Sequence, residues 1–192
     1  IATLKPDVLF FVGIAGGVKD DAIGDVVVAT QVYGYESGKV EAQFLTRPAG
    51  GQSAYALVQR AKSEARRDEW RQKLDEVASV TPKVWVAPIA AGEKVIASRE
   101  SALFQFLRIN YNDASAVEME GCGFLSAAFA YPNIKAMVIR GISDLIESKN
   151  DDSPESGQEP EELRQQQASE HAAAFAFSLL GKLNLSNVSE SS

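Results

Sequence analysis

Apolar runs alternate with segments of helical periodicity along this chain. Continuous apolar runs predict strands buried on both faces at residues 8–12, 26–30, 84–89 and 135–142, with the end of a short strand at 116–117. Apolar positions spaced three and four apart predict helices at 54–78, 98–109 and 120–130, and a terminal helix from about 169 to 180. Strands that alternate with helices are typical of an α/β sandwich, so we expect a mostly parallel sheet with helices on both faces.

Turn and capping signals divide these elements. The glycine-rich segment 13–18 predicts a tight turn after the first strand, and Ser98 is the predicted N-cap of the helix that it begins. The acidic segment 147–162 has two interpretations, a mobile lid over a site and a plain surface loop, of which the second is commoner. A polar tail at 184–192 leaves one domain at 1–183. Because the chain opens without methionine and enters a core strand at once, we expect the first N-terminal elements to be missing and the chain to be part of a larger protein.

Composition restricts the classes of function. The chain has 192 residues, of which 45% are hydrophobic and 23% charged, as in an ordinary soluble globular domain. Its 26 acidic and 19 basic residues give a formal charge of -7, which argues against a nucleic-acid surface because neutralising phosphates requires a basic excess. No apolar run approaches the roughly 20 residues of a membrane span, so we predict no membrane partner. The single cysteine, Cys122, excludes an intrachain disulfide and a cysteine-rich zinc site, and it favours a cytoplasmic protein.

Three acidic residues stand beside apolar segments. Glu118 and Glu120 come just before a helix of small residues, and Asp144 follows the apolar run at 136–142. Carboxylates at the carboxyl ends of buried strands are costly to desolvate without partners, and open α/β sheets bind their ligands at that edge. These acids therefore predict a catalytic or sugar-binding cleft, although Asp144 taken alone is better explained as a helix N-cap.

Other candidate residues have simpler explanations. Cys122 lies at a predicted helix start, where a thiolate can be stabilised, but a small buried apolar residue is the commoner case. His171, the only histidine, is predicted to pack or to face solvent on the terminal helix. The glycine spacing at 13–17 is not the dinucleotide fingerprint G-x-G-x-x-G, so we predict no cofactor, and we predict no metal. That segment is equally compatible with a sharp turn and with backbone N–H groups that approach a ligand oxygen.

Five motifs occur in a fixed order and are together far more specific than any one alone. They are Gly-Ile-Ala-Gly-Gly at 13–17, Gly-Asp-Val-Val-Val at 24–28, Ala-Gly-Glu at 91–93, Val-Glu-Met-Glu-Gly at 117–121 and Arg-Gly-Ile-Ser-Asp at 140–144. The set resembles the purine nucleoside phosphorylase superfamily over residues 8–180, and most of all its methylthioadenosine/S-adenosylhomocysteine nucleosidases, including nucleosidase modules of larger bacterial proteins. The resemblance implies a three-layer α/β/α sandwich with a mixed central sheet, a homodimer, and cleavage of the N-glycosidic bond of a small-molecule adenine nucleoside or nucleotide.

The resemblance also assigns roles to the motif residues. Met119 would pack against the ribose, and Glu120 would accept hydrogen bonds from the ribose hydroxyls. Glu118 would be a second sugar-side acid or a structural acid. Ser143 and Asp144 would contact the purine, and Asp144 would be the acid that protonates N7. Protonation of N7 neutralises the departing base, and a positioned acid typically contributes roughly 10²–10⁴-fold. Two further segments would lie along the substrate, namely Ile14, Ala15 and Gly16, and Val95 and Ile96.

Two positions bear on the choice between hydrolysis and phosphorolysis. Phosphorylases of the superfamily hold phosphate with an arginine and a serine, at positions that correspond here to Phe11 and Ile14. Because neither side chain binds phosphate, water is the favoured nucleophile and we predict a nucleosidase, an N-ribosyl hydrolase. Family nucleosidases activate that water with a glutamate near the N-terminus. The given sequence does not include that segment, so we expect either that it is missing here or that the mechanism departs from the family, and we identify no general base in this chain.

Several alternatives stay open. The chain is also compatible with a phosphate-dependent purine nucleoside phosphorylase, and with a non-catalytic nucleoside-sensing module of a larger signalling protein. The 5′ group of the substrate is open between the apolar groups of methylthioadenosine and S-adenosylhomocysteine and the phosphates of ATP or AMP, as in defence effectors. Four basic residues are candidates to contact a 5′-phosphate, namely Lys19, Lys39, Lys94 and Arg99. Each of them is more simply explained as a surface charge.

Overall fold

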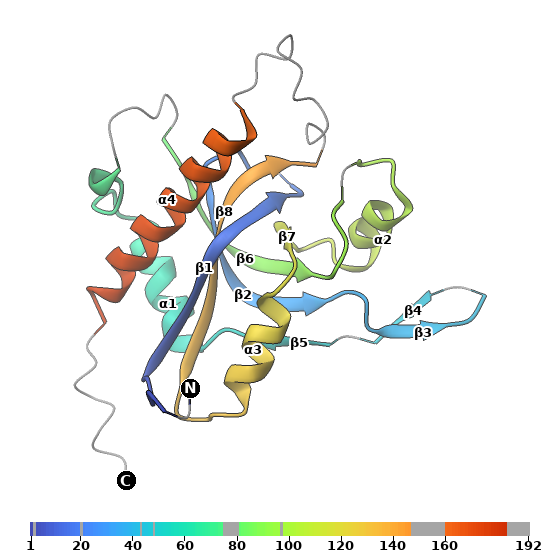
Figure 1. Cartoon of the computed structure of the whole chain (residues 1–192), viewed down its shortest axis with the longest axis horizontal. Coiled ribbons are helices and arrows are strands. Elements are labelled where there is room, and N and C mark those ends of the chain that lie inside the picture. The colour runs from blue at the N-terminus through green and yellow to red at the C-terminus, as the bar shows by residue number, and fades with distance from the viewer. Residues whose placement is uncertain are drawn as a thin grey trace.

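Figure 1 shows the chain as a computed structural model with a central sheet, helices on both sides and a small separate hairpin. The structure describes all residues except 2, 20, 43, 48, 75–80, 97, 147–159 and 184–192. The strands are β1 (Val8–Gly17), β2 (Val26–Gly34), β3 (Gly38–Val40), β4 (Phe44–Thr46), β5 (Ala49–Gln52), β6 (Val84–Ala91), β7 (Ala116–Glu118) and β8 (Lys135–Leu145). The helices are α1 (Tyr55–Glu64), α2 (Ala102–Asn110), α3 (Gly121–Phe129) and α4 (Glu161–Leu180), with a short 3₁₀ helix at Arg71–Lys73.

The central sheet is mixed and curls back on itself. Its strand order is β5-β2-β6-β7-β1-β8, and β8 also pairs with β2. β1 lies parallel to β8, and β6 lies parallel to both β2 and β7. The pairings of β7 with β1, of β5 with β2 and of β8 with β2 are antiparallel. The mixed sheet that the resemblance implies is therefore confirmed, and the two longest of these pairings, β1 with β8 and β2 with β6, are parallel as the pattern predicts.

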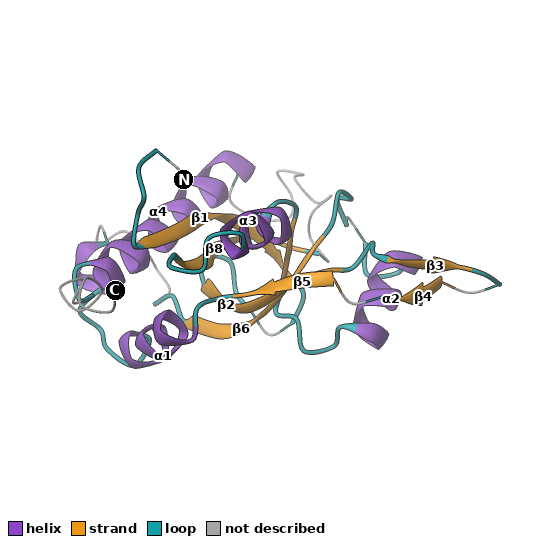
Figure 2. Cartoon of the chain, turned by 90° about the horizontal axis from the view of Figure 1, so that it is seen from below, coloured by secondary structure: helices purple, strands orange, loops and turns teal. Residues whose placement is uncertain are grey.

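Helices cover the two faces of the sheet in separate layers, and the β3–β4 hairpin projects beyond them (Figure 2). The side chains of β2 show how the layers form. Val26 and Val28 pack in a cluster with residues of α1 and α4, whereas Val27 and Ala29 pack in a cluster with residues of α3. All four are fully buried. The apolar run at 26–30 thus has the predicted cause, burial on both faces, and the fold is the expected three-layer α/β/α sandwich.

The glycine-rich segment after the first strand is not the predicted turn. It continues β1 through Gly17, with an irregular register between Ala15 and Gly16. A Cβ on Gly13 would meet Nη1 of Arg140 at 2.1 Å, and a Cβ on Gly17 would lie within 3.1–3.3 Å of three side chains. These glycines allow close packing inside a strand, and sequence alone does not show which side chains cross it.

Helices α1 and α2 differ from prediction at their ends. α1 ends at Glu64, well before its predicted end, and residues 75–80 lie outside the described part of the chain. α2 is capped by Ser101, whose Oγ accepts a hydrogen bond from the Phe104 N–H at 3.1 Å, instead of by Ser98. Both serines are good N-caps, and the backbone decides which one is used.

The terminal helix α4 begins at Glu161, earlier than predicted. Its first turns direct Arg164 and Ala168 inward, and both are buried. Neither is a large apolar residue, so the hydrophobic periodicity of this stretch is not visible in the sequence. Most of the acidic segment, residues 147–159, and the predicted tail at 184–192 lie outside the described residues, so their interpretations stay predictions.

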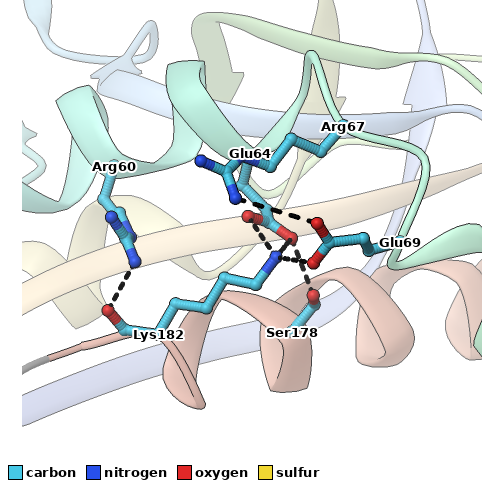
Figure 3. A network of polar contacts seen from close by, with 6 residues as sticks. All are labelled: Arg60, Glu64, Arg67, Glu69, Ser178 and Lys182. Atoms are coloured by element: carbon cyan, nitrogen blue, oxygen red, sulfur yellow. Dashed lines mark hydrogen bonds and ion pairs between the residues drawn. The ribbon is translucent and has the colours of Figure 1, made fainter.

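A polar cluster joins the far end of α4 to α1 (Figure 3). The Glu64 side chain, 2% exposed, accepts hydrogen bonds from Ser178 Oγ at 2.8 Å and from Lys182 Nζ at 2.7 and 2.9 Å. Lys182 Nζ also donates to Glu69 at 2.6 Å, and the Lys182 backbone oxygen accepts from Arg60 at 2.7 Å. Burial raises the pKa of Glu64, but the hydrogen bonds from Lys182 and Ser178 outweigh it, so this pKa lies below its ordinary value of 4.5. These contacts fix the C-terminal end of α4.

Replacing Glu64 with glutamine should lower the free energy of unfolding by about 1–3 kcal/mol at neutral pH, because Lys182 and Ser178 lose a charged acceptor. Since the folded-state pKa of Glu64 is lowered, its contribution is fully present above pH 4.5 and is lost as the pH falls through the lowered value. Urea denaturation of wild type and variant, at neutral pH and in steps below pH 4.5, measures both effects. The difference between the two proteins should shrink as the pH falls.

The matched control is Glu69→Gln, because Glu69 shares Lys182 with Glu64 but is 57% exposed. At neutral pH it should change the free energy of unfolding much less than Glu64→Gln does. Equal effects of the two variants, or a difference for Glu64→Gln that does not depend on pH, would contradict this account of the cluster.

Candidate active site

The carboxyl ends of β1, β6, β7 and β8 surround a cavity of about 420 Å³, and the first turns of α4 close one side of it. This volume is in the range of small-molecule sites, and this edge is where α/β sheets bind ligands. The cavity is lined by Gly13, Ile14, Ala15, Gly16, Lys94, Val95, Ile96, Val117, Glu118, Met119, Glu120, Arg140, Ser143, Asp144, Ile146, Glu161 and Gln165.

Every residue that the sequence analysis predicted for the site lies on the wall of this cavity. They are Ile14, Ala15, Gly16, Val95, Ile96, Glu118, Met119, Glu120, Ser143 and Asp144. Met119 and Val95 are 46% and 62% exposed, so these apolar side chains are open to a ligand, whereas Ile96 is buried. The structure thus brings together residues from four strand ends, and the role of each stays a prediction.

A buried ion pair joins two of the lining residues. Arg140 Nη2 lies 2.5 Å from Glu118 Oε2, and the two side chains are 4% and 2% exposed. The guanidinium also lies over the Phe11 ring, with 4.3 Å between Cζ and the ring centroid. Each charge would be costly to bury alone, so the two depend on each other. Gly13 leaves the space that the guanidinium occupies.

Glu118 also caps α3. Its Oε1 and Oε2 accept the Gly121 N–H at 2.8 and 2.9 Å, and Oε2 accepts the Glu120 backbone N–H at 3.2 Å. A carboxylate is favoured at a helix N-terminus, where the first N–H groups have no partner within the helix. Of the two interpretations left open for Glu118, these contacts favour the structural acid over the sugar-side acid.

Glu120 is the acid of this turn that a ligand can reach. Its side chain is 63% exposed, and its Oε2 lies 3.4 Å from Arg140 Nη2. Arg140 therefore holds two acids, Glu118 at 2.5 Å and Glu120 at the longer distance. An exposed carboxylate held at one oxygen keeps lone pairs for the hydroxyl donors of a ligand.

Asp144 lies inside β8, so its alternative explanation as a helix N-cap is wrong. Its side chain is 8% exposed, and its two oxygens have different partners. Ser143 Oγ donates to Oδ2 at 2.9 Å, and Arg164 Nη2 of α4 lies 3.6 Å from Oδ1. Asp144 is therefore an oriented, nearly buried acid that borders the cavity, a setting suited to proton transfer with a bound ligand.

Three polar lining residues had no role in the sequence analysis: Arg140, Glu161 and Gln165. Arg140 carried a usable signal, because a lone arginine inside the apolar run at 136–142 requires a buried partner. The other two belong to the stretch of α4 whose helix the hydrophobic pattern does not reveal. Sequence alone does not show that this helix reaches the cavity.

Lys94 is the lining residue among the four cations considered for a 5′-phosphate. It forms an ion pair with Glu36, which also accepts the Glu93 backbone N–H at 2.9 Å. The Glu93 hydrogen bond, followed by that from Lys94, holds the pKa of Glu36 below its ordinary value. Lys94 is therefore partly neutralised at the cavity.

The remaining sequence candidates are not part of the cavity wall. His171 is buried, with Nδ1 2.6 Å from the Gly24 carbonyl oxygen, and it packs α4 against a turn. Cys122 is partly buried against the core. In the described residues, no group of three or more His, Cys, Asp and Glu side chains is placed to hold a metal ion. None of the described helices combines the length and apolar character of a membrane span.

Replacing Gly13 with alanine should lower the free energy of unfolding by about 1–3 kcal/mol, because the new Cβ would displace the Arg140 guanidinium. Gly16→Ala, on the same strand, is the matched control, since its Cβ would find its nearest neighbour at an ordinary 3.5 Å. Urea denaturation measures both. In an Arg140→Met background most of the Gly13→Ala penalty should disappear. A penalty of unchanged size in that background would show that the guanidinium is not its cause.

Comparison with known proteins identifies relatives over most of the chain. The family model described as the phosphorylase superfamily matches residues 1–181. ATP nucleosidase Cap17 of Escherichia coli strain KTE188 is 27% identical over 172 aligned residues, which cover 80% of this chain and 34% of that protein. The chain therefore spans about a third of the length of the curated relatives that it matches.

Solved structures share the fold. Futalosine hydrolase of Helicobacter pylori strain 26695 has a TM-score of 0.70 at 23% identity, covering 94% of this chain and 70% of that one. The 5′-methylthioadenosine/S-adenosylhomocysteine nucleosidase of Neisseria meningitidis, in complex with methylthio-immucillin-A, has a TM-score of 0.70 at 22% identity, covering 95% and 73%. Likeness at these identities shows the fold that the motifs implied. With a family match over nearly its whole length, the chain belongs to the phosphorylase superfamily.

Proposed function

We propose that this chain is a nucleosidase domain that hydrolyses the N-glycosidic bond of an adenine nucleoside or nucleotide and releases adenine. The observation that carries the proposal is the shared cavity. Ser143 and Asp144 line it from β8, while Met119 and Glu120 line it from the turn after β7. A nucleoside offers the matching chemistry at its two ends, a basic N7 on the purine and hydroxyl donors on the ribose.

Asp144 is the proposed general acid. As the bond between the sugar and the purine breaks, its electron pair passes to the purine and the sugar becomes a cation of oxocarbenium character. A proton passed from the Asp144 carboxyl to N7 neutralises the departing base, which typically accelerates such a step by roughly 10²–10⁴-fold. The Ser143 hydroxyl, 2.9 Å from Oδ2, keeps the carboxyl oriented.

Glu120 is the proposed partner of the ribose. Its exposed carboxylate accepts hydrogen bonds from the sugar hydroxyls. Its negative charge stabilises the cationic sugar that forms as the base leaves. Arg140, 3.4 Å from Glu120, holds that carboxylate in place. The half-exposed Met119 supplies an apolar surface for the sugar ring.

Water, and not phosphate, is the proposed nucleophile. On the described cavity wall, Glu120 and Glu161 add negative charge, whereas the Asp144 carboxyl carries the proton for N7 and Glu118 is paired with Arg140. An acidic wall opposes the entry of a phosphate dianion. The Arg140 guanidinium is already engaged by Glu118, and the Lys94 ammonium by Glu36.

Two of the relatives are named for substrates that differ in the 5′ group. Cap17 is named for ATP, and the Neisseria enzyme for methylthioadenosine and S-adenosylhomocysteine. A 5′-phosphate at Lys94 would have to displace Glu36. On the resemblance and the single cysteine, we also propose a homodimer in the cytoplasm, within a larger protein.

The intact protein that contains this chain should release adenine from at least one of ATP, AMP, methylthioadenosine and S-adenosylhomocysteine in buffer without phosphate. Liquid chromatography of the products measures the adenine and the sugar. Adenine that forms only with added phosphate, together with a sugar 1-phosphate, would identify a phosphorylase instead. Binding of these compounds without any adenine release would identify a sensing module.

Asp144→Asn should lower kcat by about 100- to 10,000-fold, because asparagine keeps the shape of the side chain but has no acidic proton. KM should stay within about threefold of wild type, since the lost interaction belongs to the transition state. Asp113→Asn is the control, because Asp113 accepts the Tyr33 hydroxyl at 2.8 Å and is not part of the described cavity wall. An Asp144→Asn variant with wild-type kcat would refute the assignment of the acid.

A further inference from the structure

Glu36 and Lys94 form an ion pair at the cavity, and the mechanism above gives this pair no role. Lys94 belongs to the cavity wall, whereas Glu36 follows β2 and is not one of the lining residues. The Lys94 side chain is 65% exposed, and that of Glu36 is 30% exposed. An ion pair this exposed adds little to the stability of the fold, so its main effect is on the charge that a ligand meets.

Glu36 is held by more than its contact with Lys94. Its Oε2 accepts the Glu93 backbone N–H at 2.9 Å, and its Oε1 contacts Lys94 Nζ. The preceding residue, Tyr35, is buried, and its hydroxyl donates to the Lys94 backbone oxygen at 3.4 Å. A Cβ on Gly92 would lie 2.3 Å from the Tyr35 ring, so the segment after β6 packs closely on the end of β2. The Glu36 carboxylate is therefore fixed, while the long, flexible Lys94 side chain is the member of the pair that can move.

Lys94 lies near the turn that carries the proposed ribose residues. β6 runs parallel to β7, with Ala91 opposite Glu118. The Gly92 N–H donates to the Glu118 backbone oxygen at 3.1 Å, so the ends of the two strands lie side by side. Lys94 follows Gly92 by two residues, and Glu120 follows Glu118 by two residues. A charged group carried on the ribose would therefore be within range of the Lys94 ammonium.

Both cations of the described cavity wall face carboxylates. Arg140 is paired with Glu118, and Lys94 is paired with Glu36. The exposed Glu120 adds negative charge to the same wall. A 5′-phosphate carries about two negative charges at neutral pH, and such a wall repels it. An uncharged 5′ group, such as a methylthio group, meets no such opposition.

We propose that Glu36 is a specificity-determining residue that engages Lys94, so that the site favours adenine nucleosides with an uncharged 5′ group over adenine nucleotides. This inference rests on the proposed function and names the substrate class. A 5′-phosphate would bind Lys94 only by breaking the ion pair, and it would then face the Glu36 carboxylate left without its cation. Because the 5′ group does not react, the discrimination should act mainly through KM.

The test compares Glu36→Gln with wild type in the intact protein, with AMP and methylthioadenosine as substrates. Glutamine keeps an oxygen for the Glu93 N–H and removes the charge, so Lys94 is released to the phosphate. The ratio of kcat/KM for AMP to kcat/KM for methylthioadenosine should rise about 3- to 10-fold, and the rise should shrink at high salt. The kcat/KM for methylthioadenosine should stay within about twofold of wild type. If AMP is cleaved too slowly to measure, its inhibition constant against methylthioadenosine replaces its kcat/KM, with the same expected change.

Two further variants identify the cause of the change. Adding Lys94→Met to Glu36→Gln should remove the gain, because the released ammonium produces it. Lys94→Met alone should lower the ratio about 3- to 10-fold, and it takes the place of Glu36→Gln if that variant does not fold. Glu41→Gln is the matched control, because Glu41 forms a similarly exposed ion pair with Lys39 and is not part of the described cavity wall. This control should leave the ratio unchanged.

An unchanged ratio in Glu36→Gln, or a gain that survives in the double variant, would overturn this inference and leave the proposed function standing. The same conclusion would follow from a wild-type protein whose kcat/KM for AMP or ATP exceeds that for both methylthioadenosine and S-adenosylhomocysteine. A wild-type protein that releases no adenine from any of the four substrates contradicts the proposed function, and this inference with it.

Discussion

The buried guanidinium of Arg140 is the constraint on which the rest of the site depends. A charge inside an apolar strand must be paired, and Glu118 at 2.5 Å is its partner. Breaking such a pair by removing one partner typically costs about 3–5 kcal/mol, so the pair ties the site to the stability of the fold. The same guanidinium requires glycine at position 13 and lies over the Phe11 ring. Glu118 in turn caps α3, which leaves Glu120 exposed at the cavity.

The side of the cavity that Asp144 borders depends on a second support, the docking of α4. One end of this helix is fixed by Lys182 and Glu64, and its middle lies against Gly141 with no room for a side chain between them. Its first turns then reach the cavity, where Arg164 meets Asp144. A catalytic constellation must be held to within a fraction of an ångström by its surroundings, and rigid elements do this better than loops. Here a helix and a strand hold the proposed acid.

The sequence predicts this fold where a local pattern has a local cause. The apolar run of β2 has neighbours on both faces, so its composition alone predicts a buried strand. Patterns whose cause is tertiary do not reveal that cause in the sequence. Gly13 of β1 makes room for Arg140, which is distant in sequence, whereas the local glycine spacing at 13–17 predicts a turn. The start of α4 directs an arginine and an alanine inward, which hydrophobic periodicity does not detect.

The same distinction between local and tertiary causes applies to the candidate site. The ten predicted site residues come from the family resemblance, and the structure places all ten on the wall of one cavity. Their supports were not identifiable, because an ion pair between strands, such as Arg140 with Glu118, or between helix and strand, such as Arg164 with Asp144, has no periodic signature. A lone charge in an apolar run shows that a partner exists, but it does not show which residue is the partner.

The central claim is that one cavity holds both ends of an adenine nucleoside, with Asp144 at the base and Glu120 at the sugar. A crystal structure of the protein with a non-cleavable adenosine analogue tests it most directly. The account predicts a carboxyl oxygen of Asp144 within hydrogen-bond distance of the atom at the N7 position, and a carboxylate oxygen of Glu120 within hydrogen-bond distance of a ribose hydroxyl. An analogue bound outside this cavity, or bound with its base at Glu120 and its sugar at Asp144, would contradict the account.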